Sequence, residues 1–206
     1  MGIDLTKSSH ILFFVVVLPA ISLGLGYGFT LAFPAVPFWV ETLSPLGAYG
    51  LLYNLFERYL WHWPIFRFVG IVATPDVRGR WLGEQISSFK DAQGKLRKSR
   101  VIMEVEQTFS TIKVDTYYKH WQTTHSLGSF IAVEGEYTLF ILFETTPRTG
   151  YEGEASAHKG VMRLTQLPDK KLAGTYFNAE GRSGELSFKR TRFTLHRTFE
   201  SIGDST

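Results

Sequence analysis

Residues 98–107 read Lys-Ser-Arg-Val-Ile-Met-Glu-Val-Glu-Gln, and residues 111–119 read Thr-Ile-Lys-Val-Asp-Thr-Tyr-Tyr-Lys. Apolar and polar side chains alternate in both runs, which is the pattern of β-strands that bury one face. Only the short link Thr108-Phe109-Ser110 separates them, and a link of this length favours antiparallel neighbours. The two runs therefore predict a β-hairpin, and the same pattern continues on both sides of it.

The rest of the C-terminal two thirds shows further alternating runs, separated by turn residues about every 8 to 12 positions. Short links favour a meander of antiparallel strands. Eight such strands close most simply as an up-and-down β-barrel, which leaves no exposed edge and can enclose one small ligand. An open sheet or a sandwich is the alternative. The expected strands cover residues 79–89, 98–107, 111–119, 123–134, 136–146, 158–167, 171–178 and 183–190.

Side-chain parity along these strands predicts the interior of the barrel. Most of the inward positions are apolar, so we expect a packed core. Aromatic residues at such positions are more often core filler than a ligand platform, and Tyr118 and Tyr176 are first of all expected in the core. The inward positions are Val101, Met103, Val105, Ile112, Val114, Thr116, Tyr118, Tyr137, Leu139, Ile141, Phe143, Gly160, Met162, Leu164, Leu172, Gly174, Tyr176, Leu186 and Phe188.

The first third of the chain has a different composition. No residue from 8 to 40 carries a formal charge, and residues 11–33 are dense in Leu, Val, Ile and Phe. About 20 apolar residues cross a bilayer as a helix, which is longer than the core of a signal peptide. A second apolar segment starts near Pro45 and is expected to end at Trp63, because Pro64 disfavours helix in the residue before it. These segments predict two transmembrane helices that anchor an all-β domain.

The flanking charges predict the orientation of this anchor. Lys7 precedes the first helix, and Arg67, Arg78 and Arg80 follow the second, so the positive-inside rule places both chain ends in the cytoplasm. The expected organisation is a transmembrane hairpin over 1–66, a connector over 67–78, a cytoplasmic barrel over 79–192 and a tail over 193–206. The chain has no cysteine, which excludes disulfides and thiolate chemistry. Its net charge is +3.

Two features of the helices go beyond anchoring. Ala20, Gly24 and Gly28 recur at every fourth position, a pattern that permits close contact between helices. Packing against the second helix of the same chain is the favoured interpretation, and a face that joins protomers is the alternative. Glu57 lies within the second span, where a short charged side chain is costly, whereas the longer Arg58 can reach the headgroups. We nominate the small residues and Glu57 for membrane function or self-association.

One end of the predicted barrel is basic. In a meander alternate turns lie at the same end, and the end opposite Gly79 collects more Arg and Lys than Asp and Glu, together with His120, Trp121 and Tyr151. Guanidinium groups bind phosphate and aromatic rings stack on bases. This rim suits an anionic ligand that carries rings. Charged loops that are simply solvated are the alternative.

Catalytic patterns are absent from the sequence. It has no P-loop, no Gly-x-Ser-x-Gly elbow and no His-Glu-x-x-His pair. His120 and His125 lack a third metal ligand nearby. We therefore expect no enzyme activity, no metal and no cofactor.

Two motifs carry a resemblance to a known family. The first is Pro75-Asp76-Val77-Arg78-Gly79-Arg80-Trp81-Leu82-Gly83 with Ser87-Ser88, and the second is Leu172-Ala173-Gly174-Thr175-Tyr176-Phe177-Asn178 with Gly184-Glu185-Leu186. With them, nearly the whole chain resembles the two-transmembrane, β-strand-rich effectors of bacterial CBASS anti-phage systems, which act beside a CD-NTase nucleotidyltransferase. The Gly79-x-Trp81 opening is also similar to that of lipocalins.

The resemblance implies a receptor in the bacterial inner membrane whose barrel binds a cyclic dinucleotide. Binding would lead to a homo-oligomer, disruption of the membrane lipid and death of the infected cell, and no DNA or RNA polymer is expected as a partner. A tethered lipocalin-like carrier or sensor of a small apolar ligand, or a scaffold with a filled barrel, are the alternatives. The motifs and the basic rim together nominate as ligand-binding residues Ser87, Ser88, Tyr118, Trp121, Arg148, Tyr176, Asn178 and Arg182.

Overall fold

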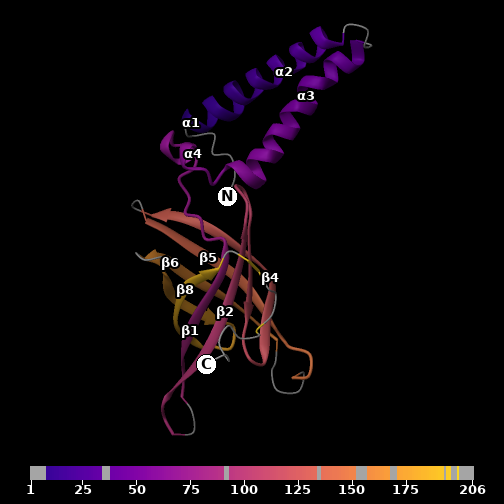
Figure 1. Cartoon of the computed structure of the whole chain (residues 1–206). Helices are drawn as coiled ribbons and strands as arrows, with labels where there is room; N and C mark the ends of the chain where they lie inside the picture. Colours follow the sequence, from indigo (N-terminus) through magenta and orange to yellow (C-terminus); the bar gives the residue numbers. More distant parts are fainter. Residues whose placement is uncertain are drawn as a thin grey trace. The chain divides into compact units, whose positions relative to one another are not determined.

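The chain divides into two compact units in the computed structural model. The helical unit comprises Met1–Thr74 with Thr108–Ser110, and the barrel unit comprises Pro75–Gln107 with Thr111–Thr206. Figure 1 shows the helices of the first unit and the strands of the second. The structure describes residues 8–33, 38–90, 93–133, 136–151, 157–167, 171–192, 194, 195 and 199. Several predicted turns and most of the expected tail lie outside these residues.

The described residues of the helical unit form two long helical segments and one short helix. The first segment runs through α1 (Ser8–His10), η1 (Ile11–Val17) and α2 (Leu18–Ala32), and the second through α3 (Phe38–Leu55) and η2 (Phe56–Leu60), where η denotes π-helix. The short helix α4 (Pro64–Phe68) follows, and Trp63 before it has the extended backbone expected of a residue that precedes proline. The second segment begins at Phe38, earlier than the predicted start near Pro45, and Pro45 lies inside α3.

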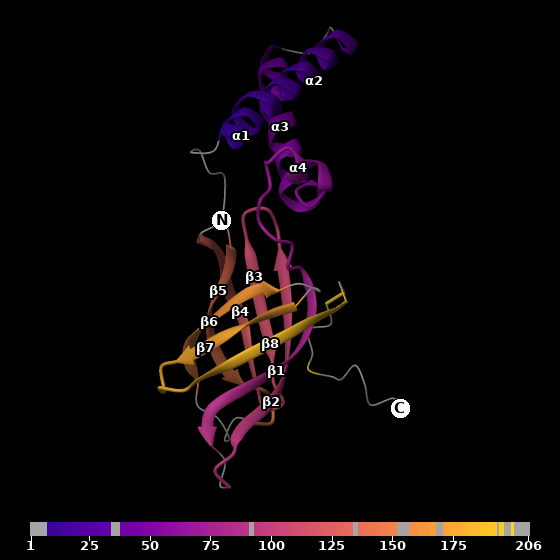
Figure 2. The ribbon, with the colours of Figure 1, turned by 90° about the vertical axis from the view of Figure 1, so that its left-hand side faces the viewer.

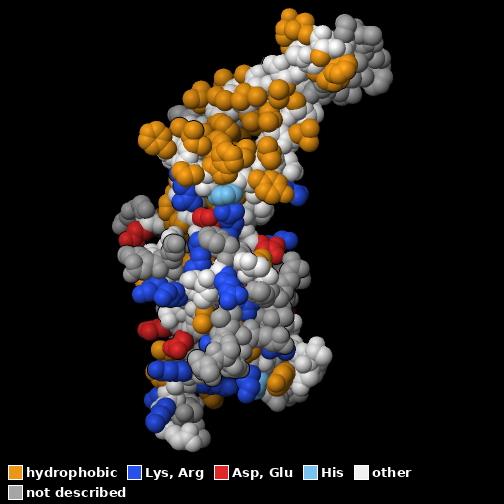
Figure 3. Space-filling model, in the orientation of Figure 1, with side chains coloured by type: hydrophobic (Ala, Val, Ile, Leu, Met, Phe, Trp, Pro, Cys, Tyr) orange, Lys and Arg blue, Asp and Glu red, His pale blue; other side chains and the backbone are white. Residues whose placement is uncertain are grey.

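One helix among the described residues, Ile11–Ala32, is long and apolar enough to cross a membrane. Figure 3 shows hydrophobic side chains over much of the visible surface of the helical unit. The second helical segment contains polar and charged residues such as Asn54, Glu57 and Arg58. A second membrane span therefore stays a prediction.

The favoured interpretation of the small-residue stripe is wrong. The buried face of the first segment carries Phe14, Leu18, Ser22 and Gly26, whereas Ala20, Gly24 and Gly28 are exposed. A Cβ added at either of these two glycines would meet nothing within 4 Å. Small residues alternate along this helix, so two faces permit close contact, and the face that packs is the one continuous with the bulky Phe14 and Leu18.

The barrel unit is the predicted closed, antiparallel, up-and-down barrel of eight strands. Each strand pairs with the next in sequence, and β8 pairs with β1; Figure 2 shows the strands that close the barrel side by side. The strand bounds differ from the prediction by a few residues, mainly because β4 begins at Trp121, directly after a tight turn. The strands are β1 (Gly79–Lys90), β2 (Leu96–Gln107), β3 (Ile112–Tyr117), β4 (Trp121–Val133), β5 (Glu136–Pro147), β6 (His158–Leu167), β7 (Lys171–Asn178) and β8 (Ser183–Arg192).

The interior of the barrel is a packed apolar core built largely from the predicted inward positions, with Val77 and Trp81 in addition. Trp81 is fully buried near the start of β1, where its Nε1 donates to the Val77 carbonyl at 2.9 Å and the guanidinium of Arg190 lies 4.7 Å from its ring. Space for a ligand is therefore to be sought at the opposite end. The core cluster contains Val77, Trp81, Val101, Met103, Val105, Ile112, Val114, Leu139, Ile141, Phe143, Met162, Leu164, Leu172, Tyr176, Leu186 and Phe188.

Candidate functional site

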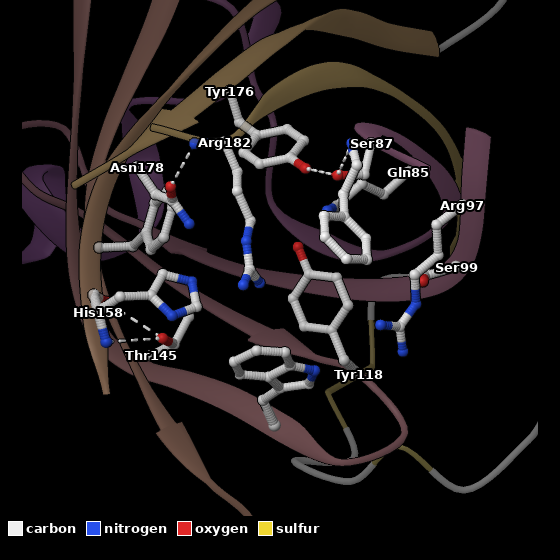
Figure 4. A pocket seen from close by; sticks show the side chains of 13 residues that line it. Gln85, Ser87, Arg97, Ser99, Tyr118, Thr145, His158, Tyr176, Asn178 and Arg182 are labelled. Carbon is white, nitrogen blue, oxygen red and sulfur yellow. Dashed lines mark hydrogen bonds between the residues drawn. The ribbon is translucent and has the colours of Figure 1, made fainter. Parts of the chain in front are cut away.

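A pocket opens at the end of the barrel opposite Gly79, where β1, β3, β5 and β7 end (Figure 4). It encloses roughly 650 Å³ of space, part of which is open solvent. Its walls come from strands that are far apart in sequence, because the closed barrel arranges all of its strands around one opening. The lining residues are Gln85, Ser87, Phe89, Arg97, Ser99, Tyr118, Trp121, Phe143, Thr145, His158, Tyr176, Asn178 and Arg182.

Hydroxyl groups form one side of the pocket. The hydroxyl of Tyr176 donates to Oγ of Ser87 at 3.0 Å, and Ser87 Oγ also accepts the backbone N–H of Phe89 at 3.2 Å. Tyr118 lies close to this pair, and its hydroxyl points into the pocket in Figure 4. Burial, with a smaller contribution from Tyr176, raises the pKa of Tyr118 above its ordinary value of 10.0. Tyr118 therefore presents a protonated hydroxyl that can donate to a ligand.

Arginine side chains reach the pocket from two elements. Arg97 comes from the start of β2, and Arg182 comes from the turn between β7 and β8. Asn178 shapes this turn, because its Oδ1 accepts the backbone N–H groups of Glu180 at 3.2 Å and Arg182 at 2.9 Å. The Arg182 guanidinium lies 5.3 Å from the centroid of the Phe89 ring. The basic rim predicted from the sequence thus brings at least two guanidinium groups to the pocket.

Aromatic rings form the remaining wall. The rings of Trp121 and His158 meet edge to face with centroids 5.1 Å apart. His158 is fixed by its backbone, which exchanges hydrogen bonds with Oγ1 of Thr145 across β5 and β6, at 3.1 and 3.2 Å. Ring faces beside guanidinium groups are what a charged ligand with planar rings requires.

The pocket brings together most of the residues nominated from the sequence, and two nominated residues lie elsewhere. Ser88 follows the opposite parity to Ser87, and its Oγ accepts the backbone N–H of Ser183 at 3.2 Å. Arg148 donates to the carbonyls of Tyr118 and Lys119, at 3.4 and 3.2 Å. Arg148 therefore supports the turn between β3 and β4. The nominated residues that line the pocket are Ser87, Tyr118, Trp121, Tyr176, Asn178 and Arg182.

Several pocket residues were not nominated from the sequence. Gln85 and Phe89 share the parity of Trp81 on β1, and Arg97 and Ser99 share the parity of Val101 on β2. Extending the inward parity to the strand ends identifies them, whereas the turns point to Arg97 only as part of the basic rim and the motifs point to none of them. The residues missed in this way are Gln85, Phe89, Arg97, Ser99, Phe143, Thr145 and His158.

Glu57 lies in the helical unit, where it binds the link between β2 and β3. Its Oε1 accepts hydrogen bonds from Oγ1 of Thr108 at 2.5 Å and from Oγ and the backbone N–H of Ser110 at 2.6 and 3.1 Å. Phe109 between them is buried among Phe14 and Phe56. Oε1 of Glu57 is thus engaged by hydroxyl and amide donors, whereas Oε2 is buried with no hydrogen bond among the described residues.

The described residues contain no group of three His, Asp or Glu side chains that could hold a metal ion. The ring of His120 stacks on Tyr151 with centroids 4.5 Å apart, and the side chain of His125 lies outside the part of the chain that the structure describes.

Comparison with known proteins places this chain in a family. The model of the Cap15 cyclic dinucleotide receptor domain matches residues 72–190, a span that contains all the residues lining the pocket. The chain is also 21% identical over 155 residues to CD-NTase-associated protein 15 of Staphylococcus schleiferi, which covers 75% of this chain and 81% of that relative.

Proposed function

The chain belongs to the family of the Cap15 cyclic dinucleotide receptor domain, and we propose that it binds its ligand in the pocket at the barrel end opposite Gly79. The observation that carries this proposal is the combination of Arg97 and Arg182 with aromatic rings in one pocket. A cyclic dinucleotide has two phosphodiesters and two bases. Guanidinium groups and ring faces match these two chemistries.

Different side chains of the pocket are proposed to bind different parts of the ligand. Arg97 and Arg182 approach from separate elements and supply donors for phosphate oxygens (Figure 4). Trp121 supplies a face on which a base can stack, a contact worth about 1–3 kcal/mol per base. The hydroxyls of Tyr118 and Ser87 supply polar contacts for base edges or ribose. The filled core below the pocket leaves the ligand at the barrel end rather than deep within the barrel.

The helical unit is proposed to deliver the effect of an anti-phage effector. The apolar helix Ile11–Ala32 suits residence in the bacterial inner membrane, with the second helical segment as a second span and both chain ends in the cytoplasm. On ligand binding, copies of the chain associate, disrupt the membrane and kill the infected cell. The exposed face with Ala20, Gly24 and Gly28 supports helix contact between protomers. The protein thus acts as a receptor and effector rather than as an enzyme.

Calorimetry on the full-length chain in detergent or nanodiscs tests the binding proposal. The panel comprises cyclic dinucleotides with purine, pyrimidine and mixed bases, with the corresponding linear dinucleotides as controls. We expect saturable heat at a stoichiometry of about one ligand per barrel with at least one cyclic member. If no cyclic dinucleotide gives heat of binding, the proposed function is contradicted. If an apolar ligand alone gives heat of binding, a lipocalin-like carrier is favoured.

Leakage of dye from liposomes tests the membrane proposal. The reconstituted full-length chain is expected to release dye only after addition of the cyclic dinucleotide. Gly24→Leu is expected to reduce leakage, because the larger side chain blocks close approach of helices. Gly50→Leu makes the same change at an exposed position of α3 and serves as the control. Equal leakage by both variants and the wild type would reject the Gly24 face.

A further inference from the structure

The turn between β7 and β8 brings a carboxylate to the arginine that the ligand needs. Oε2 of Glu180 lies 3.3 Å from Nη2 of Arg182. Its other oxygen, Oε1, lies 4.0 Å from Nδ1 of His158. Both Arg182 and His158 line the pocket. An anionic group of the protein itself therefore stands beside the cationic wall of the pocket.

The backbone of this turn is held by groups other than the carboxylate of Glu180. The turn is held by Oδ1 of Asn178, which accepts the backbone N–H of Glu180 and of Arg182, and by Gly181, whose φ of +74° suits glycine. None of these interactions uses the Glu180 carboxylate. The side chain is 29% exposed, and rotation of the carboxylate further into water hydrates it, so this movement carries no desolvation cost.

A carboxylate and a phosphodiester compete for the same guanidinium. Each carries one negative charge, and each accepts hydrogen bonds from the planar fork of an arginine. A phosphate oxygen on Arg182 would also approach the Glu180 carboxylate, and like charges in proximity repel. Simultaneous occupation of Arg182 by both anions is therefore unfavourable.

Building on the proposed function, we propose that Glu180 occupies the phosphate subsite at Arg182 in the empty receptor and that a ligand phosphodiester displaces it. Glu180 then works against binding: it holds Arg182 ready at the pocket wall and raises the ligand concentration needed for activation. A receptor whose activation kills the cell gains a higher threshold from such an internal competitor.

The test is calorimetric titration of the full-length chain with the cyclic dinucleotide that binds the wild type. Glu180→Gln removes the charge and keeps the shape, and we expect binding roughly two- to fivefold tighter, the range that breaking an exposed ion pair provides. Glu185→Gln makes the same charge change at an exposed position of β8 and is expected to bind as the wild type does. In the Arg182→Ala background, Glu180→Gln is expected to have no further effect.

The outcomes separate this inference from the proposed function. Unchanged or weaker binding by Glu180→Gln, with normal binding by the wild type, overturns the inference and leaves the proposed function standing. Equal gains for Glu180→Gln and Glu185→Gln also overturn it, because general charge would then explain both. If the wild type binds no cyclic dinucleotide, the proposed function fails and the inference fails with it. Thermal unfolding of each variant verifies that the barrel is intact.

Discussion

The hydroxyl of Tyr176 on β7 donates a hydrogen bond to Oγ of Ser87 on β1 at 3.0 Å, although the two residues are 89 positions apart in sequence. β8 lies between these strands and pairs with both. Gly184 on β8 is the partner of Tyr176 in one pairing and of Ser87 in the other. The bond therefore ties three strands together at the pocket.

Tyr176→Phe removes this hydrogen bond and keeps the ring. We expect the free energy of unfolding of the barrel to fall by about 1 kcal/mol, the usual net contribution of one hydrogen bond. The measurement is denaturant unfolding of the full-length chain, followed by tryptophan fluorescence. Tyr137→Phe, at a half-buried residue on β5 outside the pocket, is the matched control. Equal stability of the Tyr176 variant and the wild type would show that the bond contributes nothing.

Gly184→Ala is expected to disturb the same region more strongly. A Cβ at Gly184 would lie 2.1 Å from the carbonyl oxygen of Ile86 and 2.7 Å from the ring of Tyr176. Backbone must shift to admit the methyl group, and overpacking of this kind costs about 1–3 kcal/mol. Unfolding measurements should show this loss, while Ser183→Ala at the exposed neighbour stays near the wild type. Wild-type stability and an unchanged pocket in Gly184→Ala would contradict the close packing of Gly184 against the Ile86 carbonyl and the Tyr176 ring.

Arg80 and Glu104 form an ion pair in which both side chains are only 2% exposed. Arg80→Met leaves the carboxylate of Glu104 buried without its guanidinium, and we expect a loss of about 3–5 kcal/mol in the free energy of unfolding. The double variant Arg80→Met/Glu104→Leu should recover much of it, because no buried charge is then left uncompensated. Arg163→Met, at an exposed position of β6, controls for loss of an arginine. A small loss of unfolding free energy in Arg80→Met would contradict the buried ion pair.

The pH dependence of stability should carry a contribution from Asp76. Burial alone would raise the pKa of Asp76, but hydrogen bonds and charge from Arg78, with the charge of Arg190, lower it below its ordinary value of 3.8. A lowered pKa in the folded state means that the contribution is complete above the unfolded pKa and is lost as pH falls through the folded value.

Unfolding of the wild type and of Asp76→Asn between pH 6 and pH 2 measures this contribution. The stability difference between them is expected to be largest near pH 6 and to shrink below about pH 4. Arg78→Ala should reduce the difference, since it removes the main partner. A constant difference across the range would exclude a titrating Asp76.

The strand pattern was sufficient to predict the barrel, because side-chain parity and short links leave few ways to bury the apolar faces. Val101, Met103 and Val105 lie in the core as predicted. Parity also places Arg80 and Glu104 on the outer face, where solvation is the ordinary expectation, yet both are buried. The burial of an outward residue depends on what covers the barrel locally, and alternation along a strand carries no information on that.

The sequence predicts a basic and aromatic barrel end, and the structure has a pocket at that end, but only part of its lining was nominated by residue. Turn parity identified the barrel end, since alternate turns of a meander must share it. Arg148 could not be separated from Arg182 by sequence, because both lie in turns at that end, and only the path of each side chain decides whether it enters the pocket. The first helix likewise has two faces with small residues, one with Gly24 and one with Gly26, and the sequence does not show which of them packs against the second helical segment.

The affinity of arginine variants for the cyclic dinucleotide tests the central claim most directly. Arg182→Ala removes a guanidinium from the pocket wall, whereas Arg163→Ala removes one from an exposed position on β6. Titration of both full-length variants should show binding weakened at least about tenfold for Arg182→Ala, equivalent to about 1.4 kcal/mol, and unchanged for Arg163→Ala. Wild-type affinity in Arg182→Ala would contradict ligand binding at this end of the barrel.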